Sequence, residues 1–214
     1  MAENKRTVAV FDFDGTLTTK DTLLEFIKFS CGTGKFYFVF LLYIPLLVLM
    51  KLKLYPNWKC KQKVFAHFFK GMKISEFSRL GKDFAKEIEN IRKESMIAEL
   101  RKLREEGASI YVISASIDEW VRPFCTQLGA LDVISTKVEI DSLGCLTGRF
   151  LTLNCYGQEK VRRLLEIEPN RKEYILVAYG DSQGDKELLE FADRGILIKS
   201  VSYTHLTLPT IRLV

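Results

Sequence analysis

The sequence lacks the features that mark secreted proteins and proteins that bind nucleic acids. Its five cysteines are odd in number, and none of them form a CxxC pair. No signal peptide precedes the first apolar segment at residues 7–10, so we expect reduced thiols on the cytosolic side of a membrane. The net charge is +5, yet the sequence holds no basic motif with interleaved aromatic residues, which argues against a nucleic-acid partner.

One long segment also lacks charge altogether. Residues 36–50 contain no charged side chain, and Lys51 and Lys53 follow them. A helix of this length and apolarity approaches what is needed to span a bilayer. Two alternatives remain open for residues 36–54: the buried helix of a small helical cap, or a helix that enters a membrane between flanking lysines.

The rest of the chain contains enough apolar material for a core. Its 214 residues, 47% of them hydrophobic, suit one domain with an insertion. Short apolar segments at residues 7–10, 109–116, 131–135 and 174–180 are typical of buried strands in a parallel sheet. From residue 59 to 106, apolar residues recur at spacings of three and four, which predicts helices between the first two strands. We therefore expect an α/β fold.

Two acids, Asp12 and Asp14, directly follow the first predicted strand. Side chains two residues apart at a strand exit project the same way, and Gly15 permits a sharp turn after them. Both carboxylates then lie at the carboxyl end of the strand, where open α/β sheets bind ligands. Neighbouring carboxylates repel unless a cation lies between them or one carries a proton. A functional pair explains this placement better than a solvated turn does.

A second pair of acids follows the fourth predicted strand. Asp181 comes directly after that strand, and Asp185 follows four residues later. Together with Asp12 and Asp14 they form a cluster of oxygen ligands at the carboxyl ends of parallel strands. This chemistry suits Mg²⁺, which binds few carboxylates and leaves room for a substrate phosphate.

A hydroxyl and a lysine occupy comparable positions. Ser114 lies at the carboxyl end of the second predicted strand, and with the N–H of Ala115 it can bind an anion near a helix start. Lys160 falls in the first turn of a predicted helix, where a cation opposes the helix dipole, so we expect it to have a phosphate or carboxylate partner. A plain strand-end serine and a solvated lysine remain the alternatives.

Two further hydroxyl residues fit local roles. Thr22 with Glu25, and Ser116 with Glu119, have the spacing of a capping box. We therefore expect Thr22 and Ser116 to cap helices rather than to belong to the site.

These stretches, in this order, resemble the haloacid dehalogenase-like (HAD) phosphatase superfamily. The resemblance rests on FDFDGTLT at residues 11–18, VISAS at 112–116, the lysine of YGQEKV at 156–161 and GDSQGD at 180–185. The helical insertion after the first motif is similar to that of its IB branch, which includes phosphoserine phosphatase. The apolar stretch and residues 151–161 are similar, more narrowly, to bacterial phosphatidylglycerophosphatase C.

The resemblance implies a Rossmann-like three-layer core with a parallel sheet and a helical cap inserted after the first strand. The implied ranges are 1–20 and 107–199 for the core and 21–106 for the cap. Residues 200–214 contain no acid and no clear periodicity and resemble a non-native tail, so we do not consider His205 as a ligand.

The resemblance also implies a Mg²⁺-dependent phosphomonoester hydrolase that forms an aspartyl-phosphate. Asp12 would be the nucleophile and Asp14 the general acid and base. The metal would be held by Asp12 and Asp181 and by the backbone carbonyl of Asp14. The other implied site residues bind the phosphoryl oxygens or support that binding: Ser114, Ala115, Lys160 and Asp185.

The implied substrate is a lipid phosphate such as phosphatidylglycerophosphate, with membrane contact through residues 36–54. Because Asp12 acts with groups beyond that segment, a single full crossing is excluded, and two crossings do not fit in its length. A shallow, re-entrant or monotopic insertion on the cytoplasmic side of an inner membrane remains. The alternatives are a soluble phosphatase for a small metabolite such as phosphoserine and a non-catalytic protein that binds phosphorylated ligands. The alcohol portion of the substrate is not indicated.

Overall fold

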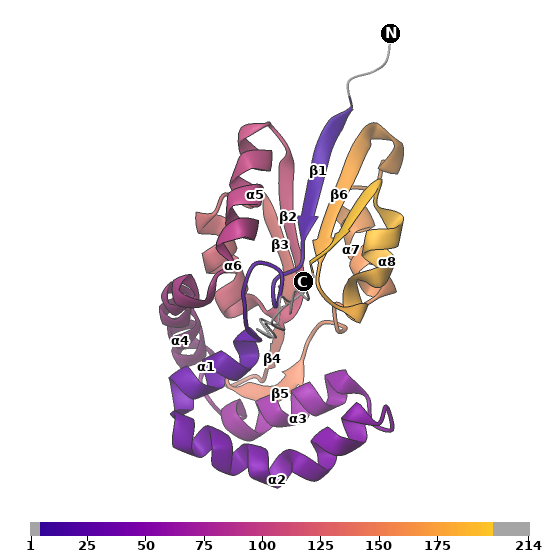
Figure 1. Ribbon diagram of the computed structural model, residues 1–214. Coiled ribbons are helices and arrows are strands. Elements are labelled where there is room, and N and C mark those ends of the chain that lie inside the picture. The colour runs from indigo at the N-terminus through magenta and orange to yellow at the C-terminus, as the bar shows by residue number, and fades with distance from the viewer. Residues whose placement is uncertain (1–4, 199–214) are drawn as a thin grey trace, which may run out of the picture.

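Five parallel strands form the central sheet of the protein (Figure 1). The computed structural model describes residues 5–198. The strand order is β3–β2–β1–β6–β7, and every neighbouring pair is parallel. The strands are β1 (Arg6–Phe11), β2 (Ser109–Ile117), β3 (Asp132–Thr136), β6 (Tyr174–Gly180) and β7 (Arg194–Leu197). The first predicted strand therefore lies in the middle of the sheet, between the second and fourth predicted strands.

Helices cover both faces of the sheet. Ala9 and Phe11 of β1 pack into one hydrophobic core and Val8 and Val10 into a second, because successive side chains of a strand point to opposite faces. Helices α5 and α6 cover the first core, and α7 and α8 cover the second (Figure 1). These helices are α5 (Glu94–Glu105), α6 (Asp118–Gln127), α7 (Gln158–Ile167) and α8 (Lys186–Phe191). The predicted three-layer α/β core is confirmed.

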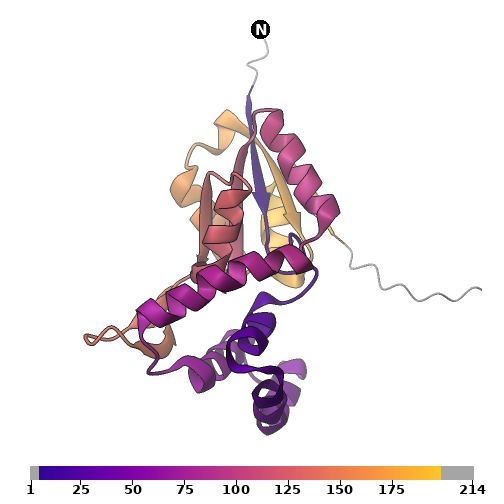
Figure 2. The ribbon, with the colours of Figure 1, turned by 90° about the vertical axis from the view of Figure 1, so that its left-hand side faces the viewer.

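A group of helices follows β1 and lies beyond the carboxyl ends of the strands (Figures 1 and 2). The group consists of α1 (Thr22–Cys31), α2 (Thr33–Lys51), α3 (Asn57–Phe69) and α4 (Ile74–Glu87), with a 3₁₀ turn at Ile88–Ile91. The ring of Phe26 stacks on Trp120 of α6 at 4.4 Å and contacts Phe77 of α4 at 5.4 Å. These aromatic contacts join the helical group to the sheet domain. Figure 2 shows α4 running between the two parts.

A separate antiparallel hairpin, β4 (Val138–Ile140) and β5 (Leu146–Phe150), packs on the helical group. The ring of Phe150 lies 5.2 Å from that of Phe65 in α3. The N–H of Phe150 donates a hydrogen bond to Gln62 Oε1 at 3.1 Å. Two short 3₁₀ turns, Arg171–Glu173 and Gln183–Asp185, flank β6.

The packing departs from the implied ranges at two places. Helix α5 falls inside the cap range 21–106, but its Ile97 and Leu100 pack in the core beneath β2. The hairpin falls inside the core range 107–199, but it contacts α3. We propose that the cap consists of α1 to α4 together with this hairpin. The implied tail at 200–214 lies outside the described residues.

Neither predicted capping box forms. Asp21 is the N-cap of α1, and its side chain accepts a hydrogen bond from the N–H of Leu24, which makes Thr22 the first helical residue. The N-cap of α6 is Ile117 without a side-chain cap, because β2 continues through Ser116. The hydroxyls of Thr22 and Ser116 are therefore available to other partners.

Helix α2 is not the buried cap helix that one alternative expects. Phe36 and Val39 are its buried residues, whereas Phe38 is 65% and Leu41 64% exposed. In the described part of the chain, α2 is the one helix with the length and apolarity to cross a membrane, and 11% of its apolar window is buried. The cap therefore presents an apolar surface to its surroundings.

Candidate active site

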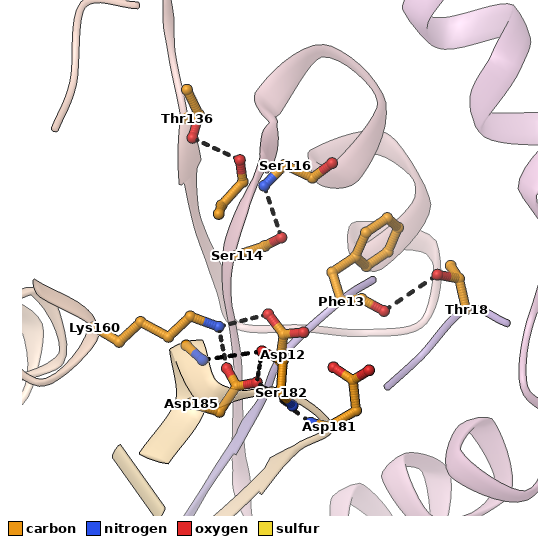
Figure 3. Close-up of polar contacts among 12 residues, drawn as sticks. Asp12, Phe13, Thr18, Ser114, Ser116, Thr136, Lys160, Asp181, Ser182 and Asp185 are labelled. Carbon is orange, nitrogen blue, oxygen red and sulfur yellow. Dashed lines mark hydrogen bonds and ion pairs between the residues drawn. The ribbon is translucent and has the colours of Figure 1, made fainter. Parts of the chain in front are cut away.

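A pocket of about 950 Å³ lies between the carboxyl ends of the strands and the cap. It contains six of the seven predicted site residues, namely Asp12, Asp14, Ser114, Ala115, Lys160 and Asp181. Asp185, the seventh, is buried beside them and contacts Lys160. The structure thus brings all the predicted site residues together, from three strand ends and one helix. Figure 3 shows Asp12, Ser114, Lys160, Asp181 and Asp185 among them.

Lys160 joins two acids that come from different strands. Its Nζ atom lies 2.5 Å from Oδ1 of Asp12 and 2.5 Å from Oδ1 of Asp185, and its side chain is 3% exposed (Figure 3). Burial alone would lower the pKa of Lys160, but the two carboxylates raise it above its ordinary value. The lysine therefore stays charged, and Asp12 and Asp185 are the carboxylate partners expected for a cation in the first turn of α7.

The carboxyl of Asp12 is also buried. Burial raises its pKa to about 6, against the opposing charge of Lys160, and repulsion from Asp185 adds to the rise. Asp185 is fully engaged: beyond Lys160, its Oδ2 accepts bonds from the N–H groups of Asp181 and Ser182 and from the Ser182 hydroxyl. Asp185 thus holds the loop after β6 and orients Lys160.

Asp181 lies directly over the turn at Gly15. The backbone of Gly15 has a φ of +80°, and a Cβ atom added there would overlap Oδ2 of Asp181. Only glycine allows the loop after β1, which carries Asp12 and Asp14, to approach the loop after β6, which carries Asp181, this closely. Burial, and then repulsion from Asp185, raise the pKa of Asp181 above its ordinary value.

The acids fit a divalent metal. One carboxylate oxygen each from Asp12, Asp181 and Asp185 lies within 4.8 Å of the others. Since the hydrogen bonds of Asp185 occupy its carboxylate, Asp12 and Asp181 are the side chains left for coordination. Among the described residues, no N–H or hydroxyl donates to the backbone carbonyl of Asp14, which leaves that oxygen free as well. Such an all-oxygen set suits Mg²⁺.

Ser114 and Ala115 lie where the ladder between β2 and β3 is interrupted, between Ile113 and Ile117. The Ser114 hydroxyl accepts a hydrogen bond from the N–H of Ser116 at 2.9 Å, so its own proton is left for a ligand (Figure 3). Ser114 is 1% exposed and lines the pocket. The interruption removes this stretch of backbone from the regular pairing of β2 with β3.

Asp14 turns toward the cap rather than toward Lys160. Its Oδ1 atom accepts two hydrogen bonds from Thr22, one from the N–H at 2.9 Å and one from the hydroxyl at 2.6 Å. Burial raises the pKa of Asp14 to about 6, and Asp21 adds to the rise while Lys61 opposes it. Asp12 and Asp14 therefore have different partners within one pocket.

Sequence reasoning missed three residues here. The sequence pattern predicts a helix cap for Thr22 and no role in the site for Lys61 or Lys93. Lys61 of α3 lines the pocket and donates to the carbonyl of Ala115 at 3.0 Å, while Lys93 donates to the carbonyl of Gly15. No spacing rule marks these lysines, because their partners lie 54 and 78 positions away.

Comparisons with known proteins agree with the α/β fold described above. Residues 9–190 match the family model described as haloacid dehalogenase-like hydrolase. Protein CicA of Caulobacter vibrioides is 32% identical over 188 residues, covering 87% of this chain and 83% of that protein.

Solved structures share the fold. A Bordetella pertussis protein of unknown function aligns with a TM-score of 0.75 at 18% identity, covering 88% of both chains. A phospho-aspartyl intermediate analogue of phosphoserine phosphatase aligns with a TM-score of 0.63 at 20% identity, covering 92% of this chain and 87% of that one. With its motifs gathered in one pocket at the strand ends, the chain belongs to the haloacid dehalogenase-like hydrolase family.

Proposed function

We propose that this hydrolase cleaves phosphomonoesters through an aspartyl-phosphate on Asp12. The observation that carries the proposal is that Asp12 and Asp14, two residues apart in one pocket, are held by different partners, Lys160 and Thr22. Carboxyls in different environments can take different roles, one as nucleophile and the other as proton donor. The likeness in fold to a phospho-aspartyl analogue of phosphoserine phosphatase supports the same chemistry.

The proposed reaction has two steps. Asp12 attacks the phosphorus atom while the bond to the leaving oxygen breaks, and Asp14 gives that oxygen a proton. A water molecule then attacks the phosphorus, Asp14 takes its proton, and the bond from Asp12 to phosphorus breaks to release phosphate. Lys160 and Ser114 bind the phosphoryl oxygens as charge spreads over them.

We propose Mg²⁺ as the cofactor, held by Asp12, Asp181 and the backbone carbonyl of Asp14. When bound there, the ion screens the negative phosphate from the attacking carboxylate. Asp185 does not coordinate in this scheme; it keeps Lys160 charged and the loop after β6 in place.

Phosphate release from a panel of monoesters, with and without Mg²⁺, tests this proposal. Asp12→Asn is expected to abolish release while the protein still folds and still binds Mg²⁺, though more weakly, because the amide retains the shape of the side chain but is no nucleophile and a poorer ligand. Turnover by Asp12→Asn would contradict the aspartyl-phosphate mechanism. A folded, Mg²⁺-binding wild type that releases no phosphate would favour a binding-only role.

We further propose that the substrate is a lipid phosphate, such as phosphatidylglycerophosphate, and that α2 contacts the membrane. The apolar side chains exposed on α2 and just after it are Tyr37, Phe38, Leu41, Leu42, Ile44, Val48, Leu49, Leu52 and Leu54. Together they form an apolar surface of the kind that marks protein or membrane contacts. The resemblance of the apolar stretch and of residues 151–161 to phosphatidylglycerophosphatase C favours a lipid.

The charge around this surface favours an anionic membrane. Residues 26–75 hold nine lysines of the chain's 32 basic residues and none of its 27 acidic ones. Within the described part of the chain, Lys28 is the one of these nine that forms an ion pair, with Glu25. Each lysine near an anionic surface adds about 1 kcal/mol of attraction.

The cap also connects this surface to the pocket. Helix α3 lies beside α2 at the end of the cap in Figure 1, and its Asn57 and Lys61 line the pocket. A lipid headgroup drawn from the bilayer would therefore meet a lysine before it reaches Asp12. We place the protein on the cytoplasmic face of an inner membrane, inserted shallowly rather than across it.

Vesicle co-sedimentation tests the membrane contact. The wild type is expected to bind vesicles containing phosphatidylglycerol and to release them at high salt, and Phe38→Asp with Leu41→Asp to bind them poorly. Leu131→Asp, at an equally exposed leucine outside the cap, serves as the control. Equal binding by the cap variant and the wild type would contradict the proposal.

A soluble monoester is the second candidate, because several solved structures of similar fold are phosphoserine phosphatases. Comparing phosphatidylglycerophosphate in micelles with phosphoserine decides between them. A strong preference for phosphoserine, together with no vesicle binding, would replace the lipid proposal and leave the phosphatase proposal intact.

A further inference from the structure

The first residue of α1 reaches into the active site. Thr22 is fully buried at the point where the chain leaves the sheet for the cap. Its backbone N–H and its hydroxyl both contact the same atom, Oδ1 of Asp14, at 2.9 and 2.6 Å. One residue thus holds one oxygen of this carboxyl through two hydrogen bonds.

The direction of each hydrogen bond follows from the chemistry of the partners. The Thr22 hydroxyl has one proton to give and two lone pairs to receive. The indole N–H of Trp120, 3.0 Å away, can only donate, so it occupies one lone pair. The Thr22 hydroxyl gives its single proton to Oδ1 of Asp14, because a carboxylate oxygen accepts. The Ser116 hydroxyl, 2.9 Å away, is then the donor in its contact with Thr22 and occupies the other lone pair.

These directions distinguish the two oxygens of Asp14. Oδ1 faces two donors and is an acceptor in both bonds. Among the described residues, no hydrogen bond reaches Oδ2, and Asp14 lines the pocket. A proton on Oδ1 would compete with the two Thr22 donors, whereas a proton on Oδ2 would not. The buried network of Trp120, Ser116 and Thr22 fixes this choice.

We propose that Thr22 is a positioning residue that makes Oδ2 of Asp14 the atom which exchanges the proton with the leaving group. This inference rests on the proposed phosphatase function. In the first step the Oδ2 proton passes to the leaving oxygen as its bond to phosphorus breaks, and the alcohol departs. In the second step Oδ2 takes a proton from the attacking water. Thr22 contacts neither substrate nor water; it acts through Asp14.

The test compares substrates whose leaving groups need different amounts of proton donation. Thr22→Val removes the hydroxyl and keeps the shape. It is expected to lower kcat/KM about 10- to 100-fold for an alkyl phosphate such as glycerol phosphate, because it removes a hydrogen bond to a charged group. For 4-nitrophenyl phosphate, whose leaving group departs without a proton, the loss is expected to be less than about threefold. Thr22→Ser, which restores the hydroxyl, is expected to recover the alkyl phosphate activity.

Thr18→Val is the matched control. Thr18 is a fully buried threonine in the same loop, and its hydroxyl bonds to the backbone carbonyls of Phe13 and Lys20 rather than to a carboxyl. Loss of the Thr18 hydroxyl is expected to change kcat/KM by the same factor for both substrates. The inference is overturned if Thr22→Val also lowers both rates equally, or lowers neither. A wild type that releases phosphate from no monoester would instead remove the proposed function, which separates the two failures.

Discussion

Lys160 and Asp12, 148 positions apart in the chain, form a buried ion pair with their Nζ and Oδ1 atoms 2.5 Å apart. The same lysine neutralises Asp185. One cation therefore serves two buried carboxylates, and the charge balance of the pocket depends on it. Breaking such an arrangement by removing one partner is costly, because charges remain buried without compensation.

Lys160→Met is accordingly expected to lower the free energy of unfolding by about 3 kcal/mol at pH 8. The loss is expected to shrink at pH 5, below the raised pKa of Asp12, because the protonated carboxyl needs no counter-charge. Phosphate release is expected to fall by at least about 100-fold, since the lysine also binds the phosphoryl group.

Urea unfolding at pH 5 and pH 8, together with the release assay, checks this prediction. Lys82→Met, at an exposed lysine, is the control and is expected to change neither quantity. A variant of Lys160 with full stability at pH 8 would show that Asp12 and Asp185 do not need this cation.

Gly15→Ala tests the close contact between Gly15, in the loop after β1, and Asp181, in the loop after β6. At a φ of +80° an alanine is strained, and its Cβ would overlap the carboxylate of Asp181. Displacement of Asp181 is expected to weaken Mg²⁺ binding about tenfold, which corresponds to about 1.4 kcal/mol of binding free energy. Titration calorimetry with Mg²⁺ measures the change.

Gly144→Ala separates the clash from the strain. Gly144 has a φ of +72° in the hairpin turn, but a Cβ added there meets no atom within 4 Å. This control is expected to lose stability from backbone strain and to bind Mg²⁺ normally. If both variants bind Mg²⁺ equally well, Asp181 is not held by its approach to Gly15.

The positions of most site residues could be read from sequence because these residues lie at the carboxyl ends of predicted strands. Asp12, Ser114 and Asp181 are fixed by local order along the chain, and parallel strands then gather their ends at one edge of the sheet. Thr22 and Ser116 could not be read in this way. Both fit a capping box, yet their hydroxyls meet 94 positions apart.

The reason is that spacing rules compare residues within one helical turn, and they cannot tell which of two adjacent residues becomes the cap. Asp21 takes the cap of α1, which shifts Thr22 by one position and turns its hydroxyl toward Asp14. The three-layer core was predictable from strand hydrophobicity. The surface of α2 was not, because an apolar sequence does not reveal what it packs against.

Glu119 gives the protein a pH-dependent stability that is separate from the site. It lies where α6 packs against Gly81 of α4, and its Oε2 atom is buried without a hydrogen-bond partner among the described residues. Burial raises its pKa from 4.5 to about 7, while the unfolded chain keeps the lower value. Between these values the folded state binds the extra proton, so stability falls as the pH rises from about 5 to 7.

Glu119→Gln removes this fall, and its unfolding free energy is expected to exceed that of the wild type at pH 8 but not at pH 4.5. The raised pKa values of Asp12 and Asp14 also make stability fall as the pH rises. Urea unfolding is therefore compared between variant and wild type at each pH, without Mg²⁺. Glu76→Gln, at an exposed glutamate, is the control and is expected to change the unfolding free energy at neither pH. If Glu119→Gln does not raise the unfolding free energy at pH 8, the carboxyl of Glu119 has a partner in solution.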